Sequence, residues 1–328
     1  MPGAGANHSP SEMTTERRTT FNVRVPASTA NLGAGFDCFG LALELYLSAR
    51  ATILPGPGAK SIARSRGVDG SSSLPSNPDE NLILRAMRFT AVREGIELPA
   101  VRLAVNNSIP VASGLGSSAA AAVAGIALAY QIGGREVSKE SALEYAREID
   151  GHADNVAAAL HGGLVVTLAR GNSVVAVKKL WPKTIRLVVV TPHLELQTKK
   201  SRAVLPEKVD RADAVYNLQR AALLVALLEE RHYDLIWDAL QDRLHQPYRQ
   251  HLIPGAPEIL SLPKTPGLLG IALSGSGPSV VALAMAEFDE IGRRMAGCFE
   301  RAGLMSTVRT LEADQEGLMF LESRATRK

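Results

Sequence analysis

Apolar and polar side chains first alternate regularly at residues 21–25, and this alternation predicts a half-buried strand. A second apolar stretch, 41–54, also predicts a strand and ends at Pro-Gly-Pro-Gly, which is typical of a turn. Residues 82–94 carry apolar side chains at helical spacing, and residues 101–105 again predict a strand. Between these segments, the Gly-, Ser- and Pro-rich residues 67–78 are expected to form an exposed excursion.

The rest of the chain mixes helices and strands without a regular βαβ alternation. An alanine-rich run, 119–132, predicts a buried helix, and 139–150 predicts another with Ser138 as its N-cap. Further strands are expected at 164–168, 185–191 and 306–311, a strand-loop-strand unit at 269–284, and helices at 211–230, at 233–244 and from Glu287. This irregular order favours an α+β fold over a doubly wound sheet.

Two domains are expected, because 328 residues exceed the usual size of a single core. Polar and proline residues between 171 and 183 indicate a division, which gives an N-terminal domain at 21–175 and a C-terminal domain at 176–328. Residues 1–20 are rich in Gly, Ser, Thr and Pro and contain no apolar stretch, so they predict a disordered tail and not a secretory signal.

The composition argues against several function classes. No apolar run reaches the roughly 20 residues that a membrane-spanning helix needs. The net charge is only +3, and no stripe of basic and aromatic residues indicates nucleic-acid binding; small anionic substrates suit this charge equally well. The two cysteines, Cys38 and Cys298, are too few for a disulfide framework or a cysteine zinc site, which favours reduced thiols in the cytoplasm.

The most informative segment is a glycine-serine loop that runs into the alanine-rich helix. It comprises Pro110, Val111, Ala112, Ser113, Gly114, Leu115, Gly116, Ser117, Ser118, Ala119 and Ala120. Glycines let the backbone approach a ligand closely, and a helix N-terminus offers free N–H groups and a positive dipole end, so this arrangement suits a polyphosphate. A serine that merely caps a structural helix explains the loop alone about equally well.

Other phosphate motifs fit less well. The chain contains no Gly-Lys pair, which a P-loop requires. Gly114, Gly116 and Ala119 match Rossmann spacing, but Pro110 interrupts the approach and no acid follows at the end of a second strand. The His-Arg-Asp and Asp-Phe-Gly motifs of protein kinases do not occur.

Three motifs together resemble those of the GHMP kinases, the superfamily of galactokinase, homoserine kinase, mevalonate kinase and phosphomevalonate kinase. They are residues 26–33 (Pro-Ala-Ser-Thr-Ala-Asn-Leu-Gly), the glycine-serine loop and residues 273–278 (Leu-Ser-Gly-Ser-Gly-Pro). The first motif, followed by Gly-Phe-Asp at 35–37, is similar to that of the homoserine kinases in particular. Ala34 is a small departure, since the family commonly has proline there.

This resemblance implies a two-domain α+β fold, with an N-terminal ribosomal-protein-S5-like α/β domain and a C-terminal ferredoxin-like α+β domain. It also implies an ATP- and Mg²⁺-dependent kinase that acts on a small alcohol, with homoserine as the favoured acceptor and threonine biosynthesis as the context. A mevalonate-type kinase and a non-catalytic ligand sensor on the same fold are the alternatives. A homodimer in the cytoplasm, without a nucleic-acid or membrane partner, is the further expectation.

The resemblance also assigns roles to individual residues. The glycine-serine loop is expected to wrap the ATP phosphates, with Asn81 near the nucleotide, although Asn81 serves equally well as a helix entry. Ser117 and Ser118 are expected near Mg²⁺, and Glu144 is the matching metal carboxylate, although sequence alone favours a solvated helix charge there. Substrate contacts are expected from Asn31, Asp37, His152, Asp154, Asn155, Thr198, Arg202, Arg249 and Gly275.

Within that set, Arg202 and Arg249 suit a carboxylate, which a guanidinium binds through two parallel hydrogen bonds. Asp154 is expected either to bind the substrate ammonium or to cap the helix at 156–160. Asn31 and Asp37 are the expected catalytic residues, with Asp37 as the proton acceptor. No dedicated general base is evident, since an amide stands at Asn155; catalysis is therefore expected to rest mainly on alignment and electrostatic stabilisation.

Overall fold

The computed structural model describes residues 19–67, 74–171 and 173–322, and it contains two sheets. The larger sheet has seven strands: β1 (Thr20–Ala30), β2 (Phe39–Ile53), β3 (Ile62–Gly67), β4 (Val101–Asn107), β5 (Leu164–Arg170), β6 (Ser173–Lys179) and β11 (Met319–Leu321). Its order is β11-β1-β2-β4-β3, and β2 bends so that its first residues also pair with β5, which in turn pairs with β6. Only β3 and β4 run parallel; the other pairs are antiparallel.

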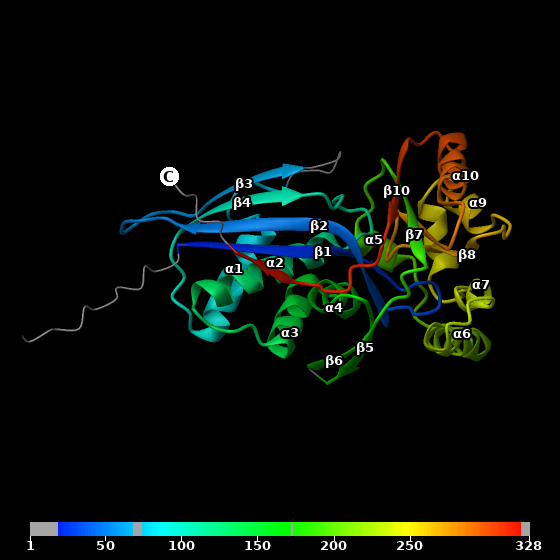
Figure 1. Cartoon of the computed structure of the whole chain (residues 1–328), viewed down its shortest axis with the longest axis horizontal. Coiled ribbons are helices and arrows are strands. Elements are labelled where there is room, and N and C mark those ends of the chain that lie inside the picture. The colour runs from blue at the N-terminus through cyan, green and yellow to red at the C-terminus, as the bar shows by residue number, and fades with distance from the viewer. Residues whose placement is uncertain (1–18, 68–73, 172, 323–328) are drawn as a thin grey trace, which may run out of the picture.

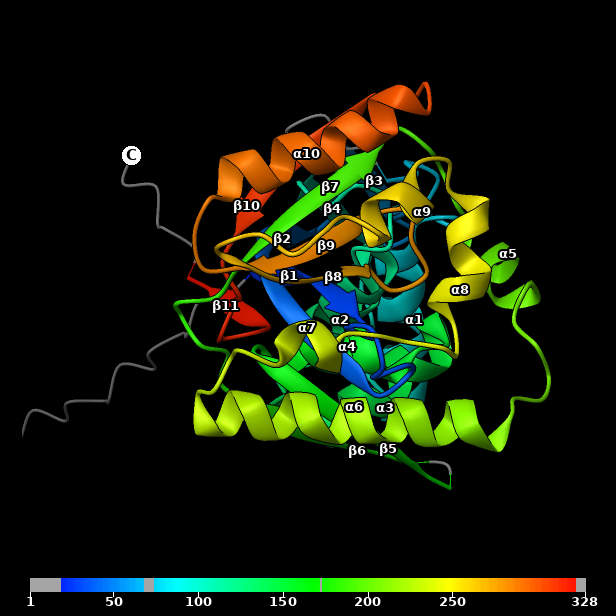
Figure 2. The ribbon, with the colours of Figure 1, turned by 90° about the vertical axis from the view of Figure 1, so that its right-hand side faces the viewer.

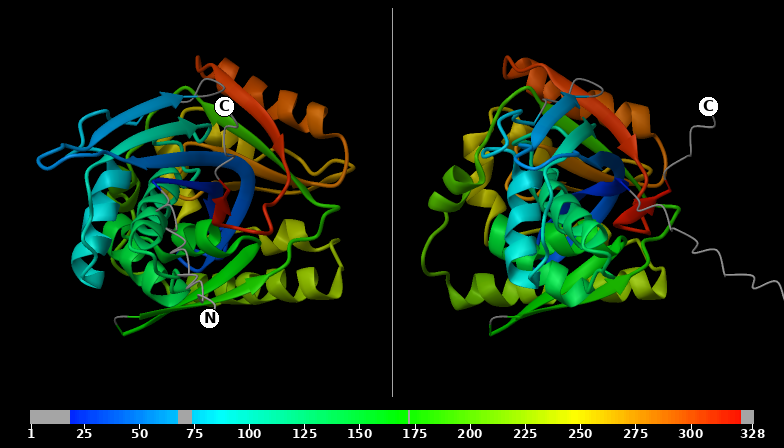
Figure 3. Two further views of the ribbon diagram at one scale, coloured as in Figure 1. Left: turned by 60° about the vertical axis from the view of Figure 1, so that its left-hand side comes forward. Right: turned by 90° about the vertical axis from the view of Figure 1, so that its left-hand side faces the viewer.

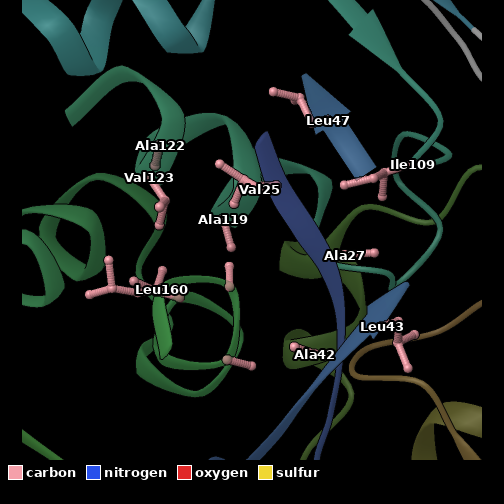
Figure 4. Packing of buried hydrophobic residues seen from close by; sticks show 14 of the residues in the cluster. Val25, Ala27, Ala42, Leu43, Leu47, Ile109, Ala119, Ala122, Val123 and Leu160 are labelled. Atoms are coloured by element: carbon pink, nitrogen blue, oxygen red, sulfur yellow. The ribbon is translucent and has the colours of Figure 1, made fainter. Parts of the chain in front are cut away.

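Four helices cover one face of this sheet: α1 (Leu82–Glu94), α2 (Ser117–Ile132), α3 (Lys139–Asp150) and α4 (Ala153–His161) (Figures 1 and 3). Helix α2 is buried over nearly its whole length, because its alanines let neighbouring backbones approach closely. Figure 4 shows Ala119 and Val123 of α2 near Val25 of β1 and Leu160 of α4. This packing fixes the first turn of α2 beside the end of β1.

The smaller sheet has the order β10-β7-β9-β8 and is fully antiparallel. Its strands are β7 (Arg186–Pro192), β8 (Leu268–Leu273), β9 (Val280–Ala284) and β10 (Ser306–Leu311). The amphipathic helix α10 (Phe288–Arg301) packs on this sheet together with α9 (Ala256–Leu260) (Figure 2). The remaining elements are α5 (Thr198–Ala203), α6 (Arg211–Glu230), α7 (Ile236–Ala239), α8 (Gln246–Arg249) and the 3₁₀ turn Gln250–Leu252.

The α+β class is confirmed, and most predicted elements are present within a few residues of their expected bounds. One helix prediction is wrong: residues 233–244 contain only the single turn α7. The Asp242 carboxylate accepts hydrogen bonds from the backbone N–H groups of Leu244, His245 and Gln246, and this local turn replaces further helical bonds. The strands β3, β6 and β11 were not predicted.

The domain division stays a proposal, and we now place it later than residue 175. Strand β6 spans residues 173–179 and belongs to the larger sheet, so the division falls after Lys179. Strand β11 returns to pair with β1, so the last described residues also belong to the N-terminal unit. The expected tail lies almost entirely outside the described residues, as does part of the expected excursion at 67–78; Thr20 already belongs to β1.

Candidate functional site

A cavity of about 370 Å³ lies where the three sequence motifs meet, and residues from both domains line it. Every residue expected to contact the substrate is part of its lining: Asn31, Asp37, His152, Asp154, Asn155, Thr198, Arg202, Arg249 and Gly275. Most of the glycine-serine loop lines it as well, from Val111 to Ser118. The chain thus places a phosphate-type loop and two guanidinium groups around one space.

The glycine-serine loop is held from both sides by the other two motifs and by Ser279, which directly follows the third motif. The Leu115 carbonyl accepts a hydrogen bond from the backbone N–H of Ser28 in β1 (3.1 Å). The Gly114 carbonyl accepts one from the Ser274 hydroxyl (2.7 Å), and the Ser113 carbonyl accepts one from the backbone N–H of Ser279 (3.0 Å). These bonds fix the loop on a rigid scaffold, as a preorganised binding site requires.

The start of α2 is open to a ligand. Gly116 is the N-cap residue, with a φ of 68°, and no side chain caps the helix. Ser117 and Ser118 therefore do not cap α2 in this structure but begin it, beside the cavity. The first N–H groups of the helix and its positive dipole end remain available for an anion.

Gly114→Ala is expected to lower kcat/KM for ATP at least about tenfold, because displacements near 1 Å in a site can cost up to about 10²-fold. Gly114 has a φ of +81°, and an added Cβ would lie 2.3 Å from the Ser274 carbonyl oxygen. Gly134→Ala is the matched control, since Gly134 has a φ of +65° but no atom within 4 Å of its Cβ position. Steady-state kinetics at saturating acceptor measure both variants, and equal effects would contradict this role for the close contact.

The segment after β1 has an unusual backbone that brings two polar side chains into the cavity. Asn31 and Asp37 both have positive φ, 73° and 54°, which costs free energy for residues other than glycine. The Asn31 amide group donates to the Gly275 carbonyl (2.8 Å) and accepts from the backbone N–H of Asp37 (3.0 Å). Asn31 therefore ties Asp37 to the third motif.

Arg202 links three elements at the cavity wall. Its guanidinium donates to the Asp37 carboxylate (2.7 Å) and, through Nε, to Nε2 of His152 (3.0 Å). The other ring nitrogen of His152 lies 3.7 Å from the Asp150 carboxylate. The nearby Asp150 carboxylate is the main cause that raises the pKa of His152, against the opposing effect of burial. The carboxylate of an acceptor substrate would thus bind to a guanidinium group that is already held in place.

Arg249 is the most deeply buried cation in the cavity, with 2% of its surface exposed. Its guanidinium donates to the carbonyls of Ser201 and Gly275, both at 3.2 Å, and lies 3.3 Å from Nδ1 of His245. Burial, together with the charge of Arg202, lowers its pKa to about 10, so it is charged at neutral pH. Among the described residues, no carboxylate forms an ion pair with Arg249.

His245 supports Arg249 from the side away from the cavity. Because a guanidinium only donates, Nδ1 of His245 accepts from Arg249, and Nε2 then carries the proton and donates to the Gly33 carbonyl (2.9 Å). The ring stacks on Phe36 with 5.1 Å between centroids. Burial lowers the pKa of His245, which keeps the ring neutral beside the buried cation.

Asp154 lies in the first turn of α4 and is 3% exposed. Its carboxylate accepts from the backbone N–H of Asn155 (2.7 Å), while His152 occupies the N-cap position. Burial raises the pKa of Asp154 to about 6 and outweighs the opposing effect of the Asn155 hydrogen bond. A buried carboxylate with so few partners suits a cationic ligand group.

Some expected site residues lie outside the cavity lining. Asn81 caps α1, and its side chain bonds the N–H groups of Ile83 and Leu84 and the Pro75 carbonyl. The other residues outside the lining are Pro110, Ala119, Ala120 and Glu144. Asp150 and Glu80 line the cavity but were not predicted as site residues, and Ser276 was predicted only as part of the third motif. The signal in the sequence was that they stand close to His152, Asn81 and Gly275 along the chain.

The site suits a nucleotide with a magnesium ion. Gly114 and Gly116 leave no room for side chains, and Ser117 and Ser118, which line the cavity, carry hydroxyl oxygens of the kind that a hard cation accepts as ligands. Within the described ranges, no cluster of three His, Cys, Asp or Glu residues forms a dedicated metal cage. Mg²⁺ needs none, since it usually binds one or two protein groups, substrate phosphates and water.

Comparisons with known proteins agree with this geometry. Residues 81–163 match the family model described as the GHMP kinases N-terminal domain. The homoserine kinase of Desulfitobacterium hafniense is 39% identical over 90% of this chain and 98% of its own length. The crystal structure of homoserine kinase from Cytophaga hutchinsonii has a TM-score of 0.82 at 30% identity and covers 93% of this chain and 98% of its own. The crystal structure of mevalonate kinase from L. major shares the fold alone, with a TM-score of 0.67 at 15% identity over 88% of this chain and 95% of its own.

Proposed function

Because this chain belongs to the homoserine kinase family of GHMP kinases, we propose that its cavity binds ATP and L-homoserine side by side. The protein is an ATP-dependent kinase that phosphorylates the side-chain hydroxyl of homoserine and gives O-phospho-L-homoserine, in threonine biosynthesis. The observation that carries the proposal is the juxtaposition of the glycine-serine loop with Arg202 and Arg249 in one cavity.

Each group of lining residues then has a task. The glycine-serine loop and the start of α2 bind the phosphates, and the apolar side chains of Leu74, Leu82 and Val111 line the part of the cavity suited to the base. Arg202 and Arg249 bind the homoserine carboxylate, and Asp154 binds its ammonium group. Ser117 and Ser118 would hold Mg²⁺, which would neutralise phosphate charge; Glu144 stays a predicted ligand.

Transfer needs the homoserine hydroxyl aligned with the γ-phosphorus of ATP. The hydroxyl oxygen forms a bond to that phosphorus while the bond from phosphorus to the β–γ bridging oxygen breaks, and ADP leaves. Asn31 and Asp37 orient the hydroxyl, and the Asp37 carboxylate accepts its proton. The hydrogen bond from the backbone N–H of Asp37 to the Asn31 side chain supports this role, because it holds the Asp37 backbone in place.

A coupled assay of ADP release with L-homoserine, mevalonate or no acceptor tests the proposal. ADP release that depends on homoserine supports it, because Asp154 suits an ammonium group that mevalonate lacks. Release that depends on mevalonate, or none from folded protein with any acceptor, would refute it. The latter result would favour a non-catalytic ligand sensor.

The raised pKa of Asp154 predicts a specific pH profile. Ammonium binding needs the ionised carboxylate, so kcat/KM for homoserine should fall about tenfold per pH unit below a pKa of about 6. Asp154→Asn should lower kcat/KM at pH 7 and remove this acid limb. His152→Gln should retain the limb, because its ring does not bind the ammonium. An unchanged limb in Asp154→Asn would show that another group titrates.

The cellular setting is also proposed. Cys38 and Cys298 are free thiols, which supports a reducing, cytoplasmic location. Among the described residues, no helix is both long and apolar enough to cross a membrane. A homodimer is the proposed assembly.

A further inference from the structure

Arg249 has one guanidinium nitrogen without a hydrogen-bond partner in the part of the chain that the structure describes. Nε donates to the Ser201 carbonyl, and Nη1 donates both to the Gly275 carbonyl and to Nδ1 of His245. Because Nη1 carries only two hydrogens, these two contacts use both of them. Arg249 lines the cavity, so Nη2 is the nitrogen that remains for a substrate carboxylate.

The His245 ring is held by contacts that do not involve Arg249. The side chain is fully buried, and the backbone N–H of His245, at the start of α8, donates to the Asp242 carboxylate (3.0 Å). The ring stacks on Phe36, and its Nε2 donates to the Gly33 carbonyl. These contacts fix the plane of the ring, and the direction in which Nδ1 points is therefore set by the fold.

We propose that His245 is a positioning residue, which accepts from Nη1 and so sets the rotation of the Arg249 guanidinium that leaves Nη2 for the homoserine carboxylate. The inference rests on homoserine as the substrate that accepts the phosphoryl group. Without Nδ1, one N–H group of a buried cation would lose its partner. The guanidinium would then turn toward another acceptor, and its Nη2 would no longer be held for the substrate.

This role requires one tautomer of the His245 ring. A guanidinium only donates, so Nδ1 must be free of a proton and Nε2 must carry it. The Gly33 carbonyl accepts that proton, and the Asp242 carboxylate lies 3.6 Å from the same nitrogen. Both neighbours of Nε2 therefore favour the tautomer that presents a lone pair to Arg249.

Two amide substitutions test the two ring nitrogens separately. In His245→Asn the amide oxygen can take the place of Nδ1 and accept from Arg249. In His245→Gln the amide reaches the place of Nε2 instead, where it can donate to the Gly33 carbonyl, and it leaves Arg249 without this acceptor.

His245→Gln should raise the KM for L-homoserine at least about tenfold, because the lost hydrogen bond involves a charged group. The KM for ATP should stay within about twofold and kcat should hardly change, as expected when only ground-state binding of one substrate is weakened. His245→Asn should keep the KM for L-homoserine within about threefold of the wild type, since the acceptor is retained. Steady-state kinetics with each substrate varied in turn, at saturating concentrations of the other, measure these constants.

A merely structural role for His245 predicts a different result, in which both variants change the two KM values alike. Equal KM values for L-homoserine in the two variants would therefore overturn the inference. Nitrogen-15 NMR of the wild type gives a second test that needs no variant: the proton should be on Nε2, and a proton on Nδ1 would overturn the inference. If the wild type releases no ADP with homoserine, the proposed function fails, and the NMR result still decides whether His245 can accept from Arg249.

Discussion

Arg249→Lys is expected to lower kcat/KM for L-homoserine by about 10³-fold. Loss of one partner of a buried, hydrogen-bonded charge pair costs about 2–5 kcal/mol, or about 30- to 5,000-fold. Lysine keeps the charge but cannot reproduce the two parallel hydrogen bonds of a guanidinium, nor its hydrogen bonds to Ser201, Gly275 and His245. The fall in kcat/KM should therefore be larger than a small displacement of the positive charge alone would cause.

Arg202→Lys is the comparison, since its side chain is 40% exposed and solvent screens its interactions. Arg202→Lys should lower kcat/KM for L-homoserine only about tenfold. Steady-state kinetics with each substrate varied in turn measure both variants, and the KM for ATP should hardly change. Equal losses at the two positions would contradict the role given to burial of Arg249.

Asp37→Asn is expected to lower kcat by about 10²- to 10⁴-fold, the range typical of general acid–base catalysis. The amide can still orient the hydroxyl, but it cannot accept the proton. The substitution also removes the ion pair with Arg202, but that pair is exposed and such pairs contribute about 0–1 kcal/mol. Loss of the proton acceptor should thus dominate.

Glu312→Gln serves as the matched control, because Arg186 and Glu312 form an ion pair with similar exposure at a distance of 2.9 Å. It should leave kcat unchanged. Single-turnover measurements separate chemistry from product release for Asp37→Asn. A kcat within about threefold of the wild type would show that alignment alone drives transfer, whereas a loss far beyond 10⁴-fold would require more than proton acceptance.

Local interactions were predictable from the sequence, and long-range ones were less so. Ser138 caps α3 as predicted, because a capping bond joins residues three apart. The wrong helix prediction at 233–244 also has a local cause, since the Asp242 carboxylate accepts hydrogen bonds from backbone N–H groups that follow it. The apolar spacing of this segment nevertheless favoured a helix. Strand β6 was missed because edge strands tolerate polar residues such as Lys178.

In the candidate site, too, local features were predictable from the sequence and long-range features were not. The glycine-serine loop is recognisable from a short run of residues, and the resemblance of motifs located its partners. Burial of Arg249 was not predictable, because an arginine in a sequence is usually a surface charge and only the packing of α8 under Gly275 removes it from water. For Glu144 the outcome is the reverse. The resemblance assigns it a role in binding the metal, but it does not line the cavity.

The pairing of β11 with β1 has a consequence for synthesis of the chain. Asn22 pairs with Leu321, so the edge of β1 stays unpaired until almost 300 further residues have been made. At about 5–20 residues per second, this delay is roughly 15–60 s. During that time the nascent chain exposes a strand edge of the kind that templates aggregation, so chaperones that bind such edges should matter most while the second domain is being translated.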